Sequence, residues 1–415
     1  MPMTSSSPGH AIRVRVRAAL GRMLVTLLAT GLIVGSLGAA NPQTSRIVAV
    51  GDIHGRRDRL VSVMEQAGLI DEHGDWIGGR STFVSVGDFM DRGPEVRAVM
   101  DLLIRLQKEA PKHHGEVVVL LGNHEMMNII GDYRYVTPEI FASFADQDSE
   151  TRRREAFETY RRTLARQEGI VGVPPSGELG EEQWMQSHPP GFVEYTEAMG
   201  PKKTYGKWLR ELPAVVKIGD TVFVHAGIHP GIRKYSIKDL NARIDAERAV
   251  YDQWKDYLVE HRVLAPFFTL DEALQAIRAY SDFYRAQAGT ADTAGGEGTG
   301  SEQLVQVLGA FSSIGNWLST HPDGPLWFRG YAKWSDEEGE SSIGPLLESY
   351  QAKRFVVGHT VMSGGIVRRF NDRIVLIDTE RPSALEIKGD RLREIYVKGM
   401  QAEPVEDRVE MPALP

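Results

Sequence analysis

The 415-residue chain contains no cysteine, and this absence excludes several kinds of chemistry. Disulfide bonds, thiolate metal ligands, cysteine nucleophiles and attachment as a lipoprotein are all ruled out. The chain also lacks an excess of basic residues, because 56 Asp and Glu outnumber 48 Lys and Arg, for a net charge of -8. It therefore has no overall electrostatic footprint for nucleic acid. Any metal ion must be held by His, Asp, Glu or Asn.

The first forty residues differ in character from the rest. Four arginines, the last of them Arg22, precede an uncharged apolar run from Met23 to about Ala40. A basic flank, an apolar segment and a small-residue end are typical of a secretory signal peptide. An uncleaved anchor formed by residues 23–40 is the alternative, since the run approaches the length that spans a bilayer. We therefore expect residues 1–40 to direct export, to the periplasm or into the inner membrane.

Three short apolar runs each end in a glycine followed by a residue that can bind metal. They span residues 46–50, 83–86 and 116–121. The segments between them have the apolar spacing of helices, and we expect Asp58 to cap the first helix and Pro94 to open the second. This β-α-β-α-β order predicts an α/β fold with parallel strands, in which the ligand site lies beyond the carboxyl ends of the strands.

Two further apolar runs, at residues 221–224 and 354–357, lead into His225 and His359. A strand at 374–378 and a hairpin over 384–397 are also predicted. The whole is predicted to form one catalytic domain with two mainly helical insertions and a disordered tail. The domain spans residues 45–400, its insertions span 137–212 and 237–320, and the tail spans 401–415.

The strand ends supply six candidate metal ligands without sulfur. They are Asp52, His54, Asp88, Asn123, His225 and His359. Such ligands suit manganese, iron or zinc, and six of them suffice for two ions that share a bridging carboxylate. Asp88 is the natural bridge because it lies on the central loop. Paired ions generate hydroxide at neutral pH and stabilise the entering and leaving oxygens of an in-line phosphoryl displacement.

Other reactive side chains flank these ligands. His124 follows Asn123 directly, so we expect it at the edge of the cluster, where it could protonate a leaving oxygen. Asp91 could hold that imidazole in position, and Arg92 offers a planar fork for phosphate oxygens. The combination predicts hydrolysis of a phosphoester.

The motifs that carry these residues resemble the signature set of the phosphoprotein phosphatase family of metallophosphoesterases. They are GDIHG at 51–55, GDFMDRG at 87–93, GNHE at 122–125, HAG at 225–227 and GH at 358–359. More narrowly, residues 122–136, 327–331 and 356–361 resemble the Shewanella-like branch of that family. The resemblance implies the calcineurin-like metallophosphoesterase fold, a central β-sandwich of mixed sheets flanked by helices, with a helical insertion over the site.

The resemblance also implies roles for individual residues. One metal would be held by Asp52, His54 and Asp88, and the other by Asp88, Asn123, His225 and His359. His124 would be the general acid, oriented by Asp91. Arg92 and a second arginine, for which the motif WFRGY indicates Arg329, would bind the phosphate.

Together these features predict an exported phosphomonoesterase that acts on phosphorylated Ser, Thr or Tyr of a protein or peptide, through in-line attack by a metal-bridging hydroxide. One alternative is a small-molecule phosphoesterase, such as a dinucleoside polyphosphate hydrolase, although the chain shows no obvious basic strip for several phosphates. Another is a non-catalytic binding module that keeps its metals for structure. The choice between phosphotyrosine and phosphoserine or phosphothreonine depends on the depth of the pocket, for which residues 126–212, and in particular Tyr133, Tyr135 and Tyr205, are candidates.

Overall fold

The structure, a computed structural model, describes residues 46–175, 177–290 and 299–400. The signal peptide or anchor predicted for residues 1–40 and the tail predicted for residues 401–415 lie outside these ranges. Within the described ranges, no helix combines the length and the apolar composition needed to cross a bilayer.

The first of two five-stranded sheets has the strand order β10-β9-β1-β2-β3. Its strands are β1 (Ile47–Val50), β2 (Thr82–Ser85), β3 (Glu116–Val119), β9 (Ser383–Lys388) and β10 (Arg391–Tyr396). The strands β1, β2 and β3 pair in parallel, whereas β9 and β10 form an antiparallel hairpin that pairs with β1. The predicted parallel unit and the predicted hairpin are both confirmed.

The second sheet has the strand order β4-β5-β6-β8-β7. Its strands are β4 (Val215–Ile218), β5 (Thr221–Val224), β6 (Arg354–Val357), β7 (Val367–Arg369) and β8 (Ile374–Leu376). The central strands β5, β6 and β8 are parallel, and the edge strands β4 and β7 are antiparallel to their neighbours. Neither edge strand is predicted from the sequence, because β4 carries a lysine and β7 is a three-residue segment with two arginines.

The two sheets pack face to face. Side chains on alternate positions of the strands, such as Ile47 and Ala49 of β1, join Phe223 and Val356 of the second sheet in one buried apolar layer. The intervening positions, such as Val48, belong to a second cluster with the helices. Because successive strand residues point to opposite faces and both faces are covered, the strands read as continuous apolar runs. The predicted sandwich of mixed sheets flanked by helices is confirmed.

Two helices connect the parallel strands of the first sheet: α2 (Arg57–Gln66) and α3 (Val96–Glu109). The predictions for their first residues are wrong, since Asp58 lies in the first turn of α2 rather than at its cap, and Pro94 precedes α3 by two residues. The reason is that neighbouring loops bond to each other at this edge. The N–H groups of Gly93 and Glu95 donate to the carbonyls of His54 and Gly55, at 2.9 and 3.0 Å.

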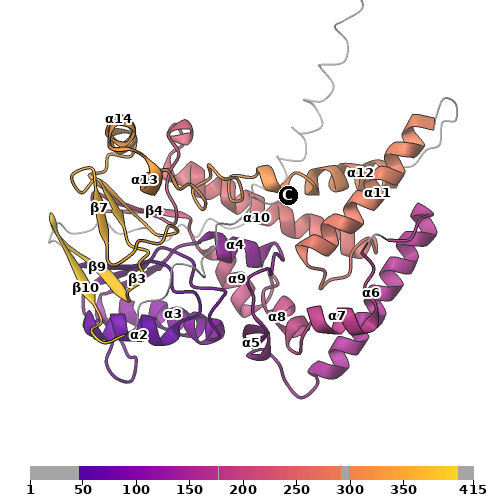
Figure 1. Cartoon of the computed structure of the whole chain (residues 1–415), viewed down its shortest axis with the longest axis horizontal. Helices are drawn as coiled ribbons and strands as arrows, with labels where there is room; N and C mark the ends of the chain where they lie inside the picture. Colours follow the sequence, from indigo (N-terminus) through magenta and orange to yellow (C-terminus); the bar gives the residue numbers. More distant parts are fainter. Residues whose placement is uncertain (1–45, 176, 291–298, 401–415) are drawn as a thin grey trace, which may run out of the picture. The chain divides into compact units, whose positions relative to one another are not determined.

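Helices fill both regions in which helical insertions are predicted. The first holds α5 (Pro138–Ala142), α6 (Ser149–Val171), α7 (Glu181–Ser187), α8 (Phe192–Ala198) and α9 (Thr204–Glu211), and the second holds α10 (Ile237–Glu260), α11 (Leu270–Thr290) and α12 (Thr299–Phe311). The short helix α4 (Asn123–Ile129) follows β3 directly, and α13 (Gly330–Lys333) and α14 (Asp336–Tyr350) precede β6. Figure 1 shows α4 between the strands and the helices α6, α7 and α8.

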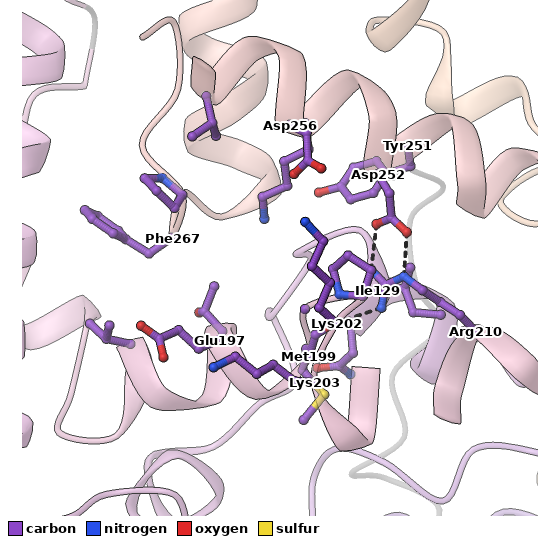
Figure 2. A pocket seen from close by; sticks show the side chains of 18 of the residues that line it. Ile129, Glu197, Met199, Lys202, Lys203, Arg210, Tyr251, Asp252, Asp256 and Phe267 are labelled. Atoms are coloured by element: carbon purple, nitrogen blue, oxygen red, sulfur yellow. Dashed lines mark hydrogen bonds and ion pairs between the residues drawn. The ribbon is translucent and has the colours of Figure 1, made fainter. Parts of the chain in front are cut away.

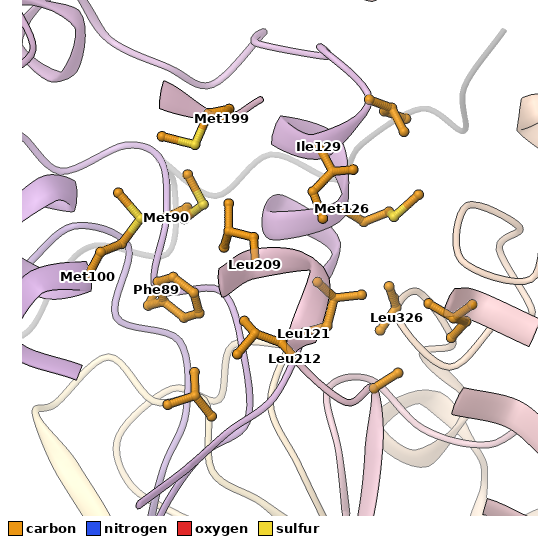
Figure 3. Packing of buried hydrophobic residues seen from close by; sticks show 14 of the residues in the cluster. Phe89, Met90, Met100, Leu121, Met126, Ile129, Met199, Leu209, Leu212 and Leu326 are labelled. Carbon is orange, nitrogen blue, oxygen red and sulfur yellow. The ribbon is translucent and has the colours of Figure 1, made fainter. Parts of the chain in front are cut away.

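An apolar cluster anchors the loop that follows β2. Figure 3 shows Phe89 and Met90 of that loop beside Leu209 of α9, with Met126 of α4 nearby. The ring of Phe89 also lies 5.3 Å from that of Trp208, centroid to centroid. Burying a side chain of this size contributes about 1.5–3 kcal/mol. Phe89 and Met90 lie between Asp88 and Asp91 in the sequence, so their burial holds these two polar residues in place.

Candidate active site

All six predicted ligands follow the carboxyl ends of parallel strands, and all six are buried, with exposed fractions from 0% for His225 to 9% for Asp52. The loops after β1, β2, β3, β5 and β6 carry them. Because parallel strands end at the same edge of a sheet, and the two sheets are stacked, the five loops converge. The structure thus brings the predicted residues together.

His225 lies at the centre of one half of the site. Its Nε2 is 2.9 Å from Oδ1 of Asn123, 3.3 Å from Oδ2 of Asp88 and 3.2 Å from Nδ1 of His359. Its Nδ1 donates to the carbonyl of Val86 at 3.0 Å. This hydrogen bond keeps a proton on Nδ1 and orients the ring, so that Nε2 of His225 points at the other three side chains.

His54 occupies the other half. Its Nδ1 donates to the carbonyl of Met90 at 3.0 Å, so Nε2 is the ring atom that could bind a metal, and it lies 3.8 Å from Oδ2 of Asp52. Ligand atoms of His54, Asp88 and His124 all lie within 4.8 Å of one another, as do those of Asp88, His225 and His359. Asp88 is the member common to both groups, and this is the position that a bridging carboxylate requires.

The donor set fits a pair of metal ions. Burial alone would lower the pKa of His225, but the charge of Asp88 raises it to about 9, whereas burial and the neighbouring His225 hold the pKa of His359 well below its usual range. Two imidazole nitrogens that face each other share a single proton, and a cation that accepts both lone pairs removes this conflict. Imidazole, carboxylate and amide oxygen are ligands that suit manganese, iron or zinc.

The backbone of the site is strained at several ligands. Asp88, His54 and His359 have positive φ angles of 53°, 46° and 65°, which non-glycine residues rarely adopt. Such conformations cost on the order of 1–3 kcal/mol each and persist where the surroundings enforce them. Gly122 provides the space, because a Cβ atom there would lie 2.2 Å from Oδ1 of Asp88.

Glu125 organises the loops from beneath, a role that the sequence analysis missed. Its Oε2 accepts the N–H groups of Asp88 and Gly122, both at 2.8 Å, and its Oε1 accepts those of Phe89 and Met90, both at 3.0 Å. Burial, followed by the charge of Asp88, raises the pKa of Glu125 to about 7. It is the third residue of α4 and accepts the N–H of the N-cap residue Gly122, and an acidic residue at this position is a signal that could have found it.

His124 and Asp91 form a close pair. The Nδ1 atom of His124 is 2.6 Å from Oδ2 of Asp91, and its Nε2 is 3.8 Å from Oδ2 of Asp88. Burial works to lower the pKa of His124, but the charge of Asp88 and the hydrogen bond to Asp91 outweigh it and raise this pKa. The raised pKa therefore favours the protonated imidazole, with a proton on Nε2, the nitrogen that faces the predicted metal ligands.

The hydrogen-bond chain continues from Asp91 into the helical region. The side-chain amide of Asn128 donates to Oδ1 of Asp91 at 2.8 Å, and its oxygen accepts the hydroxyl of Tyr195 at 2.5 Å. Both residues were missed from the sequence. Asn128 lies one turn after His124 on α4, which is a usable signal, whereas Tyr195 lies on α8, far along the chain.

The two predicted phosphate-binding arginines have different neighbours. The guanidinium of Arg92 lies over the ring of Tyr135, 5.6 Å from its centroid, and that ring is 5.2 Å from the imidazole of His124. The Nη1 atom of Arg329 donates to the carbonyl of His359 at 3.1 Å and to the hydroxyl of Thr360 at 3.3 Å.

The three tyrosines named as candidates for the wall of the pocket are in different places. Tyr135 contacts His124 and Arg92. The ring of Tyr133 packs within the helical region, 5.5 Å from that of Tyr195. The hydroxyl of Tyr205 donates to Asp101 on α3 at 2.7 Å. Of these three, Tyr135 is the one placed against the catalytic candidates.

Comparison with known proteins gives a consistent picture. The family model of the calcineurin-like phosphoesterases matches residues 45–363. An uncharacterized protein of Schizosaccharomyces pombe is 27% identical over 84% of this chain and 77% of its own length. Shewanella-like protein phosphatase 1 of Plasmodium berghei is 30% identical over 53% of this chain, and Shewanella-like protein phosphatase 2 of Arabidopsis thaliana is 31% identical over 48%. The matches span about half of these two phosphatases, 51% and 50%.

Among solved structures, the cold-active protein-tyrosine phosphatase of a psychrophilic Shewanella species shares the fold, with a TM-score of 0.52 and 23% identity. The match covers 86% of this chain and 80% of that one. The resemblance expected from the sequence motifs is confirmed. Because the family match spans most of the chain and includes every strand-end ligand, the chain belongs to the calcineurin-like phosphoesterases, a phosphatase family whose members use a dinuclear metal site.

Proposed function

We propose that this protein is a metal-dependent phosphomonoesterase that removes phosphate from Ser, Thr or Tyr side chains of proteins. The observation that carries the proposal is the position of Asp88, shared by two groups of ligand atoms, next to the His124–Asp91 pair. Manganese, iron or zinc would be held by the six predicted ligands. When bound, two such ions activate a water molecule and offset the charge of the phosphate.

The protein's own side chains would supply the remaining steps. The guanidinium groups of Arg92 and Arg329 would bind the non-bridging phosphate oxygens, and the hydrogen bonds of Arg329 to His359 and Thr360 would fix its orientation. His124 would donate the proton on Nε2 to the departing oxygen, while its Nδ1–H donates to Asp91. The raised pKa of His124 supports this role, because it keeps the acid form populated near neutral pH.

Support for a protein substrate comes from the relatives. The plant and parasite proteins are named as protein phosphatases, and the solved structure of similar fold is titled a protein-tyrosine phosphatase. We infer that this chain shares the substrate class. A choice between phosphotyrosine and phosphoserine or phosphothreonine is left to the assay below.

The test is an assay of the protein stripped of metal and then supplied with Mn²⁺. Release of phosphate from p-nitrophenyl phosphate and from matched phosphotyrosine and phosphothreonine peptides should require the ion. A dinucleoside tetraphosphate serves as the competing substrate. Faster turnover of the dinucleotide than of both peptides would replace the proposed substrate class, and an absence of Mn²⁺-dependent hydrolysis of every compound would overturn the function.

We also propose that the protein is exported, on the basis of the basic and apolar character of residues 1–40. Expression of the full chain in a bacterium and fractionation of the cells should recover it outside the cytoplasm. Sequencing of its N-terminus distinguishes cleavage near Ala40 from retention of residues 23–40 as an anchor. Recovery from the cytoplasm alone would contradict the proposal.

A further inference from the structure

A cavity of about 430 Å³ lies in the helical region, and Asn128, the hydrogen-bond partner of Asp91, is part of its wall. Residues from α4, α6, α8, α9 and α10 and from the loop between α8 and α9 line it, and none of the six predicted metal ligands does. Figure 2 shows Phe267 on one side and Arg210 on the other. Its volume falls in the usual range for sites that bind small organic molecules.

Several polar groups of the wall are already satisfied by other parts of the protein. Arg210 forms a two-pronged ion pair with Asp252, at 2.7 and 2.8 Å, and the hydroxyl of Tyr251 donates to the carbonyl of Ile130 at 2.6 Å. These groups complete the wall and have little capacity to bind a further molecule.

Lys255 is different, because among the described residues it has no hydrogen-bond or ion-pair partner. It is partly buried, and burial followed by the charge of Arg210 lowers its pKa to about 8. Two acidic residues, Glu197 and Asp256, also line the cavity, but both are exposed and are matched in charge by the exposed Lys202 and Lys203. A less exposed cation without an ion-pair partner therefore remains.

Much of the remaining wall is apolar. This apolar part is formed by Ile129, Val193, Met199, Val259, Pro266 and Phe267. A molecule that fills the cavity thus meets a large apolar surface and the partly buried ammonium group of Lys255, while the ammonium groups of Lys202 and Lys203 belong to exposed residues of the wall. This favours a ligand with an apolar body and a single anionic group, since burial of the body and pairing of the anion are both favourable.

Asn128 connects this cavity to the catalytic candidates. It is part of the cavity wall, and its side-chain amide donates to Asp91, which in turn is bonded to His124. We propose that the cavity is a regulatory site for a small amphipathic anion, held by Lys255, whose presence disturbs the Asn128–Asp91 hydrogen bond and lowers turnover. The regulatory part of this inference rests on the phosphatase function proposed above, whereas the binding part does not.

Binding is tested directly with 8-anilinonaphthalene-1-sulfonate, an aromatic compound with one anionic group, by fluorescence titration of the folded full-length protein. We expect saturable binding that becomes about tenfold weaker in Lys255→Met, because an ion pair is lost while the volume is kept. The uncharged N-phenyl-1-naphthylamine should bind wild type and variant equally. Lys207→Met, on the exposed face of α9 and outside the cavity, is the matched control and should bind as wild type does.

Two further measurements exclude misfolding and a nonspecific effect of charge as reasons for weaker binding. Thermal unfolding shows whether Lys255→Met is folded, and Lys202→Met, which changes an exposed wall residue, should weaken the binding of the sulfonate to a smaller degree. Sulfonate binding that does not saturate, or that is as tight in Lys255→Met as in wild type, would overturn the site.

Coupling to catalysis is read from hydrolysis of p-nitrophenyl phosphate. Saturating sulfonate should lower kcat by about fivefold without raising KM, and this effect should be absent in Lys255→Met. Lys255-dependent binding with no change in kcat would overturn the regulatory role and leave the binding site. A wild-type protein that binds the sulfonate but hydrolyses no phosphoester would instead count against the proposed function.

Discussion

Asp88 and Asp91 lie three residues apart in one loop, and both are buried with left-handed backbone, yet their partners come from different regions of the molecule. Both contact His124 in the first turn of α4, but Asp88, which accepts its backbone N–H, also faces His225, which follows a strand of the second sheet. Asp91 is bonded to His124 and Asn128 of α4, and through Asn128 to Tyr195 in the helical region. The sheets therefore build the part of the site that is proposed to bind metal, and the helices support the part that is proposed to hold the general acid.

The largest effect is expected from Asp88→Asn, because Asp88 belongs to both groups of candidate ligand atoms. Each of two metal ions supplies several kcal/mol of transition-state stabilisation, so turnover of p-nitrophenyl phosphate should fall by about 10⁴-fold or more. Metal content, measured by mass spectrometry, should drop in parallel. Asp58→Asn, at an exposed position in α2, is the control and should retain both properties. A variant at Asp88 that keeps two ions would show that this carboxylate does not bridge them.

His124→Asn should distinguish the loss of the general acid from the loss of metal. We expect both ions to remain and kcat to fall by roughly 10²–10⁴-fold, the usual contribution of a general acid. The loss should be large for phenyl phosphate and small for p-nitrophenyl phosphate, because the nitrophenolate leaves without help from an acid. The control is His113→Asn, at an exposed position outside the site. Since His124 also lies in a group of potential ligands with His54 and Asp88, loss of one ion from the variant would identify it as a ligand instead.

These expectations depend on residues of which only some could be predicted from the sequence. The strand-end ligands could be, because a buried parallel strand is a short apolar run, and Gly-Asp, Gly-Asn or His directly after it must lie at the ligand-binding edge. Arg329 was found only through the resemblance, since it lies in a segment between helices with no strand before it. The structure places it against His359.

Tyr195 shows where inference from the sequence ends. It is a single aromatic residue on a helix, and its contact with Asn128 arises from the packing of α8 near α4, which no local pattern encodes. Glu125 is intermediate, because its capping position is visible in the sequence, but the four backbone N–H groups that it binds come together only in the folded loops. The helical support of Asp91 is therefore information that only the structure supplies.

Asp91→Asn should reveal that support through pH. As the proposed general acid, His124 would donate a proton only in its acid form, so kcat should fall as pH rises through the pKa of His124. The hydrogen bond to Asp91 contributes, after the charge of Asp88, to raising that pKa. Its loss should shift the alkaline limb of the kcat profile to lower pH, and should reduce kcat at the optimum by about 10–100-fold. An alkaline limb at an unchanged pH would mean that another group sets it.

The smallest effect is expected from Tyr195→Phe, which removes only the hydroxyl that donates to Asn128. One buried hydrogen bond contributes about 1 kcal/mol, so the free energy of unfolding should fall by that amount, as measured by urea denaturation. If the helical region supports the proposed general acid, kcat should also fall, by about threefold, with metal content unchanged. The matched control is Tyr280→Phe on α11, a buried tyrosine whose hydroxyl has no hydrogen-bond partner among the described residues, so its removal should cost no stability and no activity. Loss of stability in Tyr195→Phe with wild-type kcat would show that Tyr195 has only a structural role. The support of Asp91 that matters for catalysis would then extend no further than Asn128.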